Sequence, residues 1–379
     1  MFLYTPGHGA FLDGLIMYSI VGSLIEYLTY KGVTDEALEH MRIKYTGNEY
    51  IINLNDLDVN IIVESIVYTL RKYEDDIVGK LIDQTNVIQK QSRGKLISTL
   101  SILTKADLLR TYIIDLSKPL HMLRANEGRL AKPKTKLKLE MAWLALMPSA
   151  GKFYLRDYGA EIREYKICLI CKGLSLLGLY LMGLIGSMVG DSLEIIPIFD
   201  GEVKASTLKL YRRIVGEKFS DLYSKISKSI DVLPDSLTPR ITLLSLSTMP
   251  QGSSLLREMK EANASWHMVA VRLTKGATQL RGFEELNIDP LINTLTSLLR
   301  DIVLKLSEIV DEAINRLRAK KAGAKNIRVD ADTIDLLFKF LEYRESSLLY
   351  KAIREIYKDD SLKRMLSLNL VINLAPLII

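Results

Sequence analysis

Three lysines that alternate with uncharged residues give this sequence its clearest candidate for binding chemistry. Lys134, Lys136 and Lys138 are separated by Thr135 and Leu137. Alternation with a period of two is typical of a half-buried strand, so the three ammonium groups would project from one face about 6–7 Å apart. This spacing suits the phosphate backbone of a nucleic acid. An edge strand that lysines protect from aggregation has the same pattern, and the sequence leaves both interpretations open.

A second basic tract without an acidic residue lies between Glu312 and Asp330. Its six cations are Arg316, Arg318, Lys320, Lys321, Lys325 and Arg328. The dipole of a helix that ends here accounts for two or three of them, because cations stabilise helix C-termini. Six exceed that need, so we predict that this tract also contacts phosphate.

A polar segment at residues 89–95 has the composition of an exposed loop. Its candidate binding side chains are those of Lys90, Gln91, Arg93 and Lys95. Glutamine and arginine carry the donors that contact base edges in DNA grooves, and Gly94 gives the backbone conformational freedom. We predict that this loop reads a short DNA motif, and the alternative is a solvated connector between two helices.

The turn from Pro148 to Lys152 superficially resembles a phosphate-binding loop. It lacks the first glycine of that motif and the serine or threonine that follows the lysine. Lys152 and two backbone amides can still approach a phosphate. We therefore include Lys152 among the candidate nucleic-acid contacts.

No arrangement of residues predicts catalysis, a cofactor or a bound metal. The four histidines are scattered without metal-ligand spacing. Cys168 and Cys171 form a lone C-x-x-C, whereas a zinc ribbon needs a second pair, and no strand and turn typical of a thioredoxin-like site are evident before them. We interpret both cysteines as packing residues of a buried helix. A third possible function class is a nucleic-acid enzyme whose acidic residues are distant in the sequence and come together only when the chain folds.

The composition is that of a globular protein in a reducing compartment. The chain has 379 residues, of which 48% are hydrophobic and 25% charged, and a net charge of +6. This charge permits a polyanionic partner without requiring one. Two cysteines form at most one disulfide, and the N-terminus lacks the basic region and cleavage site of a secretory signal. We expect a cytoplasmic protein.

One uncharged segment raises the question of a membrane. Residues 173–190 contain no charge, and their length reaches the threshold for a transmembrane helix. Five glycines and two serines lower the hydrophobicity of this segment. We predict a buried helix of a soluble core, and a membrane-embedded or membrane-attached protein built around 173–190 is the alternative.

The element pattern predicts an α+β fold, with a mixed helix and strand region over 1–286 followed by a helical bundle over 287–379. In the first region we expect helices at 10–30, 58–73 and 208–230, strands at 42–45, 49–54, 193–199 and 267–273, and a turn at 200–201. Asp289-Pro290 begins a long amphipathic helix that Gly323 ends, and further helices follow at 333–343, 346–357 and from 361 onward. Short joints between these helices predict antiparallel packing.

Three segments together resemble a known family, the large subunit of archaeal type I-A CRISPR interference (Cascade) complexes. They are the turn Tyr4-Thr5-Pro6-Gly7 with Phe11-Leu12-Asp13, the block KLKLEMAWLALMPSAGK at 136–152, and YKICLICKGLSLLG at 165–178. None of them is a catalytic motif.

The resemblance implies a non-catalytic, DNA-binding function in antiviral defence. Large subunits of this family bind the duplex at the short motif next to the target and guide the displaced strand, while guide RNA pairing reads the sequence. The implied partners are the CRISPR backbone and small subunits, the crRNA-guided complex, target DNA and a helicase-nuclease. No membrane is implied.

Overall fold

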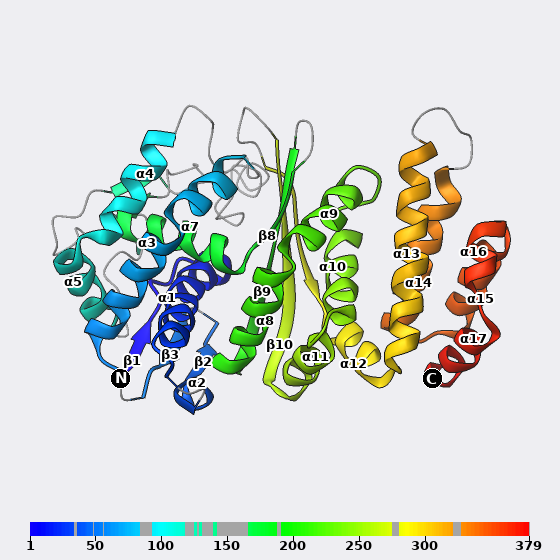
Figure 1. Ribbon diagram of the computed structural model, residues 1–379, viewed down its shortest axis with the longest axis horizontal. Helices are drawn as coiled ribbons and strands as arrows, with labels where there is room; N and C mark the ends of the chain where they lie inside the picture. Colours follow the sequence, from blue (N-terminus) through cyan, green and yellow to red (C-terminus); the bar gives the residue numbers. More distant parts are fainter. Residues whose placement is uncertain are drawn as a thin grey trace. The chain divides into compact units, whose positions relative to one another are not determined.

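The computed structural model describes residues 1–33, 36–47, 49–55, 57–83, 93–117, 125–126, 129–130, 139–141, 166–187, 191–274, 280–320 and 327–378. These residues form helices and an antiparallel sheet, which confirms the α+β class (Figure 1). They divide into two compact units. Unit 1 comprises Met1–Arg213, Ala262–Ser265 and Val271–Phe283, and unit 2 comprises Ile214–Glu261, Trp266–Ala270 and Glu284–Ile379.

Helices make up most of both units. The helices up to the unit boundary are α1 (Ala10–Tyr30), α2 (Glu36–His40), α3 (Val59–Asp83), α4 (Arg93–Ser101), α5 (Ala106–Leu116), α7 (Leu169–Met182) and α8 (Ala205–Glu217). Those that follow are α9 (Phe219–Ile230), α10 (Leu237–Thr248), α11 (Gly252–Glu261), α12 (Asp289–Ser297), α13 (Arg300–Lys320), α14 (Ile327–Tyr343), α15 (Ser346–Tyr357), α16 (Asp360–Met365) and α17 (Leu368–Leu374). Residues 214–261 thus group with the C-terminal helices by their contacts.

The main sheet of the described residues has strand order β1-β3-β2-β9-β10-β11, and β8 also pairs with β9. Its strands are β1 (Phe2–Tyr4), β2 (Arg42–Tyr45), β3 (Tyr50–Asn53), β8 (Leu184–Ser187), β9 (Asp191–Lys204), β10 (Asn263–Thr274) and β11 (Leu280–Asn287). The predicted hairpin is confirmed, because Tyr45 pairs with Tyr50 and Arg42 with Asn53. Two small ladders also occur, β4 (Ala125–Asn126) with β5 (Arg129–Leu130), and β6 (Leu139–Met141) with β7 (Lys166–Cys168).

Helix α1 forms the centre of the unit 1 core, as its all-round apolar sequence predicts. It packs mainly against α7 and α3 (Figure 1). Gly178 of α7 lies so close that an added Cβ atom would stand 1.9 Å from the Leu15 carbonyl oxygen of α1. Among the described residues, α1 alone has the length and apolar character of a membrane span, and 89% of its apolar window is buried inside the protein.

The prediction of one helix through Gly190 is wrong. Helix α7 ends at Met182, Gly183 adopts an extended conformation, and residues 184–187 form strand β8. The buried location is confirmed, since every residue from Ile170 to Ile185 is buried. With only 14 helical residues, α7 is shorter than the 18 residues expected of a transmembrane helix.

The turn predicted at Asp200-Gly201 is also wrong, because β9 continues to Lys204. Gly201 has a φ of +110°, and a Cβ atom there would stand 2.3 Å from the Asn263 carbonyl oxygen of β10. Glycine tolerates this backbone conformation and this close approach. The glycine therefore serves the contact between two strands.

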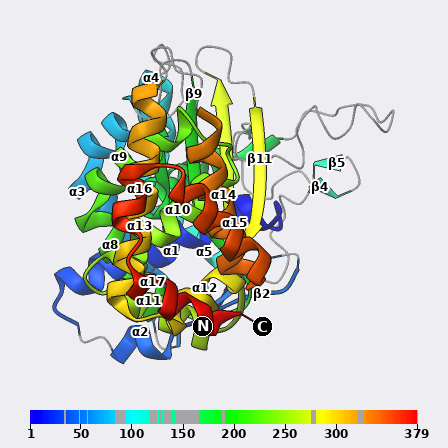
Figure 2. The same cartoon turned by 90° about the vertical axis from the view of Figure 1, so that its right-hand side faces the viewer.

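The helices of unit 2 confirm the predicted bundle (Figure 2). Helix α14 packs against both α13 and α15, and α10 packs against α9 and α13. Helix α14 begins at Ile327 and not at residue 333, and the helix expected from 361 onward is divided into α16 and α17. Two other expected helices are broken. The helix expected from Asp289 to Gly323 breaks at Leu298, which is extended, and the helix expected over 208–230 breaks at Lys218.

Candidate nucleic-acid interface

Only the end of the strand predicted to carry the phosphate-binding lysines belongs to the described structure. Lys134, Lys136, Lys138 and Lys152 lie outside the described residues. The last three residues of the predicted strand are described, and they form β6. This strand pairs antiparallel with β7, with Leu139 opposite Cys168. The end of the predicted strand is thus confirmed, and the position of its lysines stays a prediction.

The polar segment at 89–95 is not a loop throughout. Lys90 and Gln91 lie outside the described residues, but Arg93 and Lys95 belong to helix α4, so the loop prediction is wrong for these two cations and for Gly94. The physical reason is a helical apolar spacing that begins just after them. Leu96, Leu100 and Leu103 recur with helical spacing and are buried. The helix that carries Leu96 and Leu100 begins at Arg93, inside the segment that was expected to be a loop.

Arg316, in the second basic tract, lies between two carboxylates of unit 2. Its guanidinium donates two hydrogen bonds to the Asp359 carboxylate and lies 3.6 Å from the fully buried Asp330 carboxylate. The hydrogen bonds from Arg316 lower the pKa of Asp359 to about 2. Asp359 in turn caps α16 by accepting from the amides of Ser361 and Leu362. Arg316 therefore links α13 to the start of α16.

The other cations of this tract are described to different extents. Arg318 lies 3.9 Å from Asp231, and its side chain is about half exposed. Lys320 ends α13 and Arg328 lies in α14, whereas Lys321 and Lys325 are outside the described residues. Both described arginine side chains of the tract thus face carboxylates, and the tract offers less open charge than its sequence predicts.

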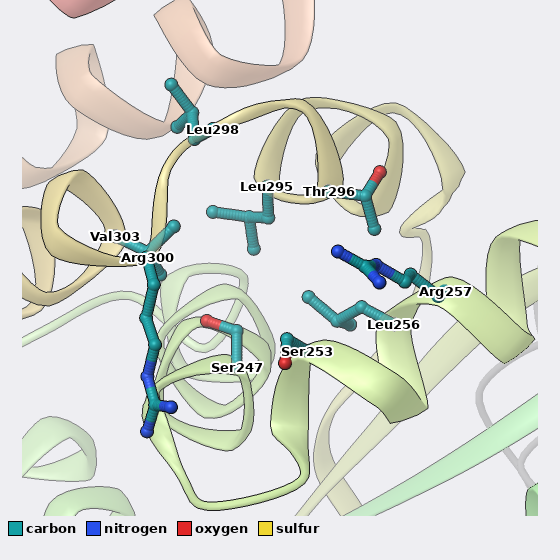
Figure 3. A pocket seen from close by; sticks show the side chains of 9 residues that line it. All are labelled: Ser247, Ser253, Leu256, Arg257, Leu295, Thr296, Leu298, Arg300 and Val303. Atoms are coloured by element: carbon teal, nitrogen blue, oxygen red, sulfur yellow. The ribbon is translucent and has the colours of Figure 1, made fainter.

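A pocket of about 150 Å³ in unit 2 is lined by two arginines that lie outside the basic tracts of the sequence (Figure 3). It lies where α10 ends, α11 begins, α12 ends and α13 begins. Its lining residues are Ser247, Ser253, Leu256, Arg257, Leu295, Thr296, Leu298, Arg300 and Val303.

Two close backbone features build this pocket. A Cβ atom at Gly252 would stand 2.0 Å from the Leu246 carbonyl oxygen, so glycine allows α11 to start directly against the end of α10. The break at Leu298 starts a new helix at Arg300. Each helix start leaves backbone amides without an intrahelical acceptor, and these amides favour an anion.

The two arginines of the pocket differ electrostatically from others in unit 2. Within the described residues, neither Arg257 nor Arg300 has an ion pair, whereas Arg240 binds Glu342 with its Nε atom 2.6 Å from a carboxylate oxygen. The Arg257 guanidinium points towards the pocket centre, and the Arg300 side chain extends past Ser247 (Figure 3). Both residues are exposed. Two guanidinium groups without carboxylates at a concave surface are suited to bind phosphate.

The remaining lining restricts what such a ligand can be. Ser247 and Thr296 donate their hydroxyl protons to main-chain carbonyls of their own helices, which leaves the exposed Ser253 hydroxyl as the lining hydroxyl able to donate. Four aliphatic side chains complete the wall. Asp301 follows Arg300 but does not line the pocket. An anion with an adjoining apolar part matches this lining.

The apolar periodicity of the sequence conceals the pairing of Arg257 with Arg300. Apolar residues recur with helical spacing from Ile292 to Leu317, which predicts one uninterrupted helix and places Arg300 in its middle. The break at Leu298 instead puts Arg300 at a helix start. No tract of cations marks either arginine, because the pair is assembled by the fold.

Two buried carboxyls of unit 1 are further notable groups. Asp13, in the first turn of α1, accepts a hydrogen bond from the Gly7 amide at 2.9 Å and holds the N-terminal turn against the helix. Burial raises the pKa of Asp13 to about 8. Glu194 of β9 is fully buried with no hydrogen-bond partner for either oxygen in the described structure, and burial raises its pKa to about 8 as well.

We expect Glu194 to make stability depend on pH. The folded protein keeps the Glu194 proton up to about pH 8, whereas the unfolded chain releases it near the ordinary glutamate value of about 4.3. The contribution of protonated Glu194 to the free energy of unfolding is therefore fully present below the pKa of the unfolded chain. It is lost as pH rises through the pKa of the folded protein, and the free energy of unfolding falls by up to about 1.4 kcal/mol per pH unit. Urea unfolding between pH 5 and 8 should show a shallower decline for Glu194→Gln.

Glu202, on the same strand, is the matched control for this measurement. Its side chain is 44% exposed, so Glu202→Gln should keep the wild-type pH dependence. Asp13 contributes with the same sign and preserves part of the slope in every variant. Equal slopes for Glu194→Gln and wild type would show that Glu194 is ionised in the folded protein.

No group of three or more histidine, cysteine, aspartate or glutamate side chains that could hold a metal ion occurs among the described residues.

A comparison with family models matches residues 1–374 to the model of a CRISPR-associated protein (Cas_Csa4). The comparison with curated proteins finds no match.

Proposed function

Because the chain belongs to the Cas_Csa4 family of CRISPR-associated proteins, we propose that it is the non-catalytic, DNA-binding large subunit of an archaeal type I-A interference complex. In this role it binds the duplex at the motif beside the target and guides the displaced strand. It works in the cytoplasm with backbone and small subunits around a crRNA, and it presents the DNA to a separate helicase-nuclease. Guide pairing reads the target sequence, so the protein needs mainly backbone contacts.

The observation that carries the proposal beyond the family match is the pocket of Arg257 and Arg300. Its two guanidinium groups lack carboxylate partners within the described residues, and two helix starts adjoin them. These features bind phosphate irrespective of base sequence. The lysines at 134, 136 and 138 add a second candidate contact, for which the sequence pattern is the support.

The salt dependence of DNA binding by the assembled, crRNA-loaded complex tests the proposal. Each lost phosphate contact lowers the slope of log K against log salt by about 0.9 for duplex DNA. We expect a decrease of about 1.8 for Arg257→Gln with Arg300→Gln, and of about 2.7 for the triple alanine variant of Lys134, Lys136 and Lys138. Affinity should fall similarly for all DNA sequences, because phosphate contacts do not specify bases.

Lys260 and Lys305 provide the control, since both are exposed on the same two helices but do not line the pocket. Their double glutamine variant removes the same charge and should keep the wild-type slope. An equal decrease of the salt slope in both double variants would show that Arg257 and Arg300 act only as general surface charge. A wild-type complex that fails to bind DNA, or an isolated chain that cleaves DNA with a divalent metal, would refute the proposed function itself.

A further inference from the structure

Two cysteine thiols lie in contact at the start of a core helix in unit 1. Cys168 ends strand β7 and occupies the N-cap position of α7, where its sulfur accepts a hydrogen bond from the Cys171 amide at 3.3 Å. The two Sγ atoms are 3.3 Å apart. Both thiols are buried. Both cysteines are buried, as expected, but only Cys171 lies in the helix, because Cys168 ends the strand before it.

The two sulfur atoms need to move only a short distance to convert the dithiol to a disulfide. A disulfide bond is about 2.0 Å long, so the sulfur atoms must approach by little more than 1 Å. N-cap and third helical residues face each other across the first turn, as in side-chain capping interactions. The backbone of β7 and α7 therefore already provides the separation that a short disulfide loop needs.

The thiols are also chemically unequal. Burial disfavours both thiolates, but hydrogen bonds from the Cys171 thiol and from amides of the first helical turn lower the pKa of Cys168 below its ordinary value. Burial and the neighbouring Cys168 raise the pKa of Cys171. The lower pKa favours Cys168 as the attacking cysteine and leaves Cys171 as the resolving one.

We propose that Cys168 and Cys171 form a redox site that a small peroxide converts from a dithiol to an intrachain disulfide. The Cys168 thiolate attacks one peroxide oxygen and becomes a sulfenic acid, and the other oxygen leaves as hydroxide. The Cys171 sulfur then attacks the Cys168 sulfur, which forms the S–S bond and expels water. Overall, two thiols and hydrogen peroxide give one disulfide and two water molecules.

Tyr112 couples this site to a neighbouring helix. Its hydroxyl, on α5, lies 3.1 Å from the Cys171 sulfur. Oxidation removes the thiol proton of Cys171, so the sulfur can no longer donate to Tyr112 and becomes a weaker partner. We therefore expect the packing of α5 on α7 to respond to the redox state of the pair.

Mass spectrometry of the folded full chain tests the proposal. After brief exposure to hydrogen peroxide, unfolding and alkylation, the wild type should carry no alkylated cysteine and should weigh two hydrogen atoms less than the reduced chain. Dithiothreitol should restore both alkylation sites. Cys171→Ser should not lose mass in this way, because Cys168 then lacks its resolving thiol and gains oxygen or stays alkylatable.

Tyr112→Phe separates the chemistry from a folding effect. This variant keeps both thiols and should form the disulfide, while hydrogen exchange in α5 should respond to oxidation in the wild type and respond less in the variant. Two alkylatable thiols in the peroxide-treated wild type, or oxygen addition to both sulfurs without a cross-link, would overturn the proposal.

Discussion

Gly178→Ala is expected to lower the free energy of unfolding by about 3 kcal/mol or more, at or above the upper end of the usual cost of overpacking. The added methyl group would stand 1.9 Å from the Leu15 carbonyl oxygen and 2.7 Å from its carbon atom. These are main-chain atoms of a buried helix, so no flexible side chain can move aside. The helices α1 and α7 would have to separate at the centre of the unit 1 core.

Gly79→Ala is the matched control, because it makes the same change in α3, which also packs on α1. No atom lies within 4 Å of its added Cβ atom. This substitution should stabilise the protein by about 0.5–1 kcal/mol, since alanine loses less backbone entropy in a helix. Urea unfolding measures both variants. A Gly178→Ala protein as stable as Gly79→Ala would show that α1 and α7 do not cross this closely.

Arg316→Met is expected to cost about 3–5 kcal/mol of folding free energy, the range for breaking a buried ion pair. The variant removes the guanidinium that lies 3.6 Å from Asp330, whose side chain is fully buried, and it breaks both hydrogen bonds to Asp359. Methionine fills similar space but brings no charge. The link between α13 and the start of α16 should loosen first.

Arg318→Met, two residues further along α13, serves as the control. Its ion pair with Asp231 spans 3.9 Å, and its side chain is 44% exposed, so the substitution should cost under about 1 kcal/mol. Denaturant unfolding and DNA binding should both be measured. If Arg316→Met keeps wild-type stability but weakens DNA binding, Arg316 is a phosphate contact, as its sequence context alone predicts.

The elements predicted most accurately are those in which local signals and tertiary packing agree. The bounds of Ala10–Tyr30 are predicted correctly because an apolar run follows a Pro-Gly turn and the helix is buried from Phe11 to Ile25. The hairpin at 42–53 has a turn glycine with positive φ at Gly47, which its sequence indicates. The helix Ser346–Tyr357 has the predicted bounds, because polar residues flank it on both sides.

The wrong boundaries arose where long-range contacts override a continuous local pattern. Residues 173–190 are uncharged throughout, so composition alone cannot show that the chain leaves α7 at Gly183 to pair Leu184 with Ile195 of β9. The break at Leu298 is hidden in the same way. The pocket of Arg257 and Arg300 depends on that break and on α11, and therefore no contiguous motif could have predicted it.

The packing of α1 on α7 has a consequence for the synthesis of this chain. Helix α1 is complete at Tyr30, but α7 ends only at Met182, and ribosomes add roughly 5–20 residues per second. A helix apolar enough to resemble a membrane span is thus synthesised roughly eight to thirty seconds before α7, the helix that covers most of it. During that interval, the described elements that can cover α1 are those that precede α7 in the chain, among them β3 and α3, which also pack on α1.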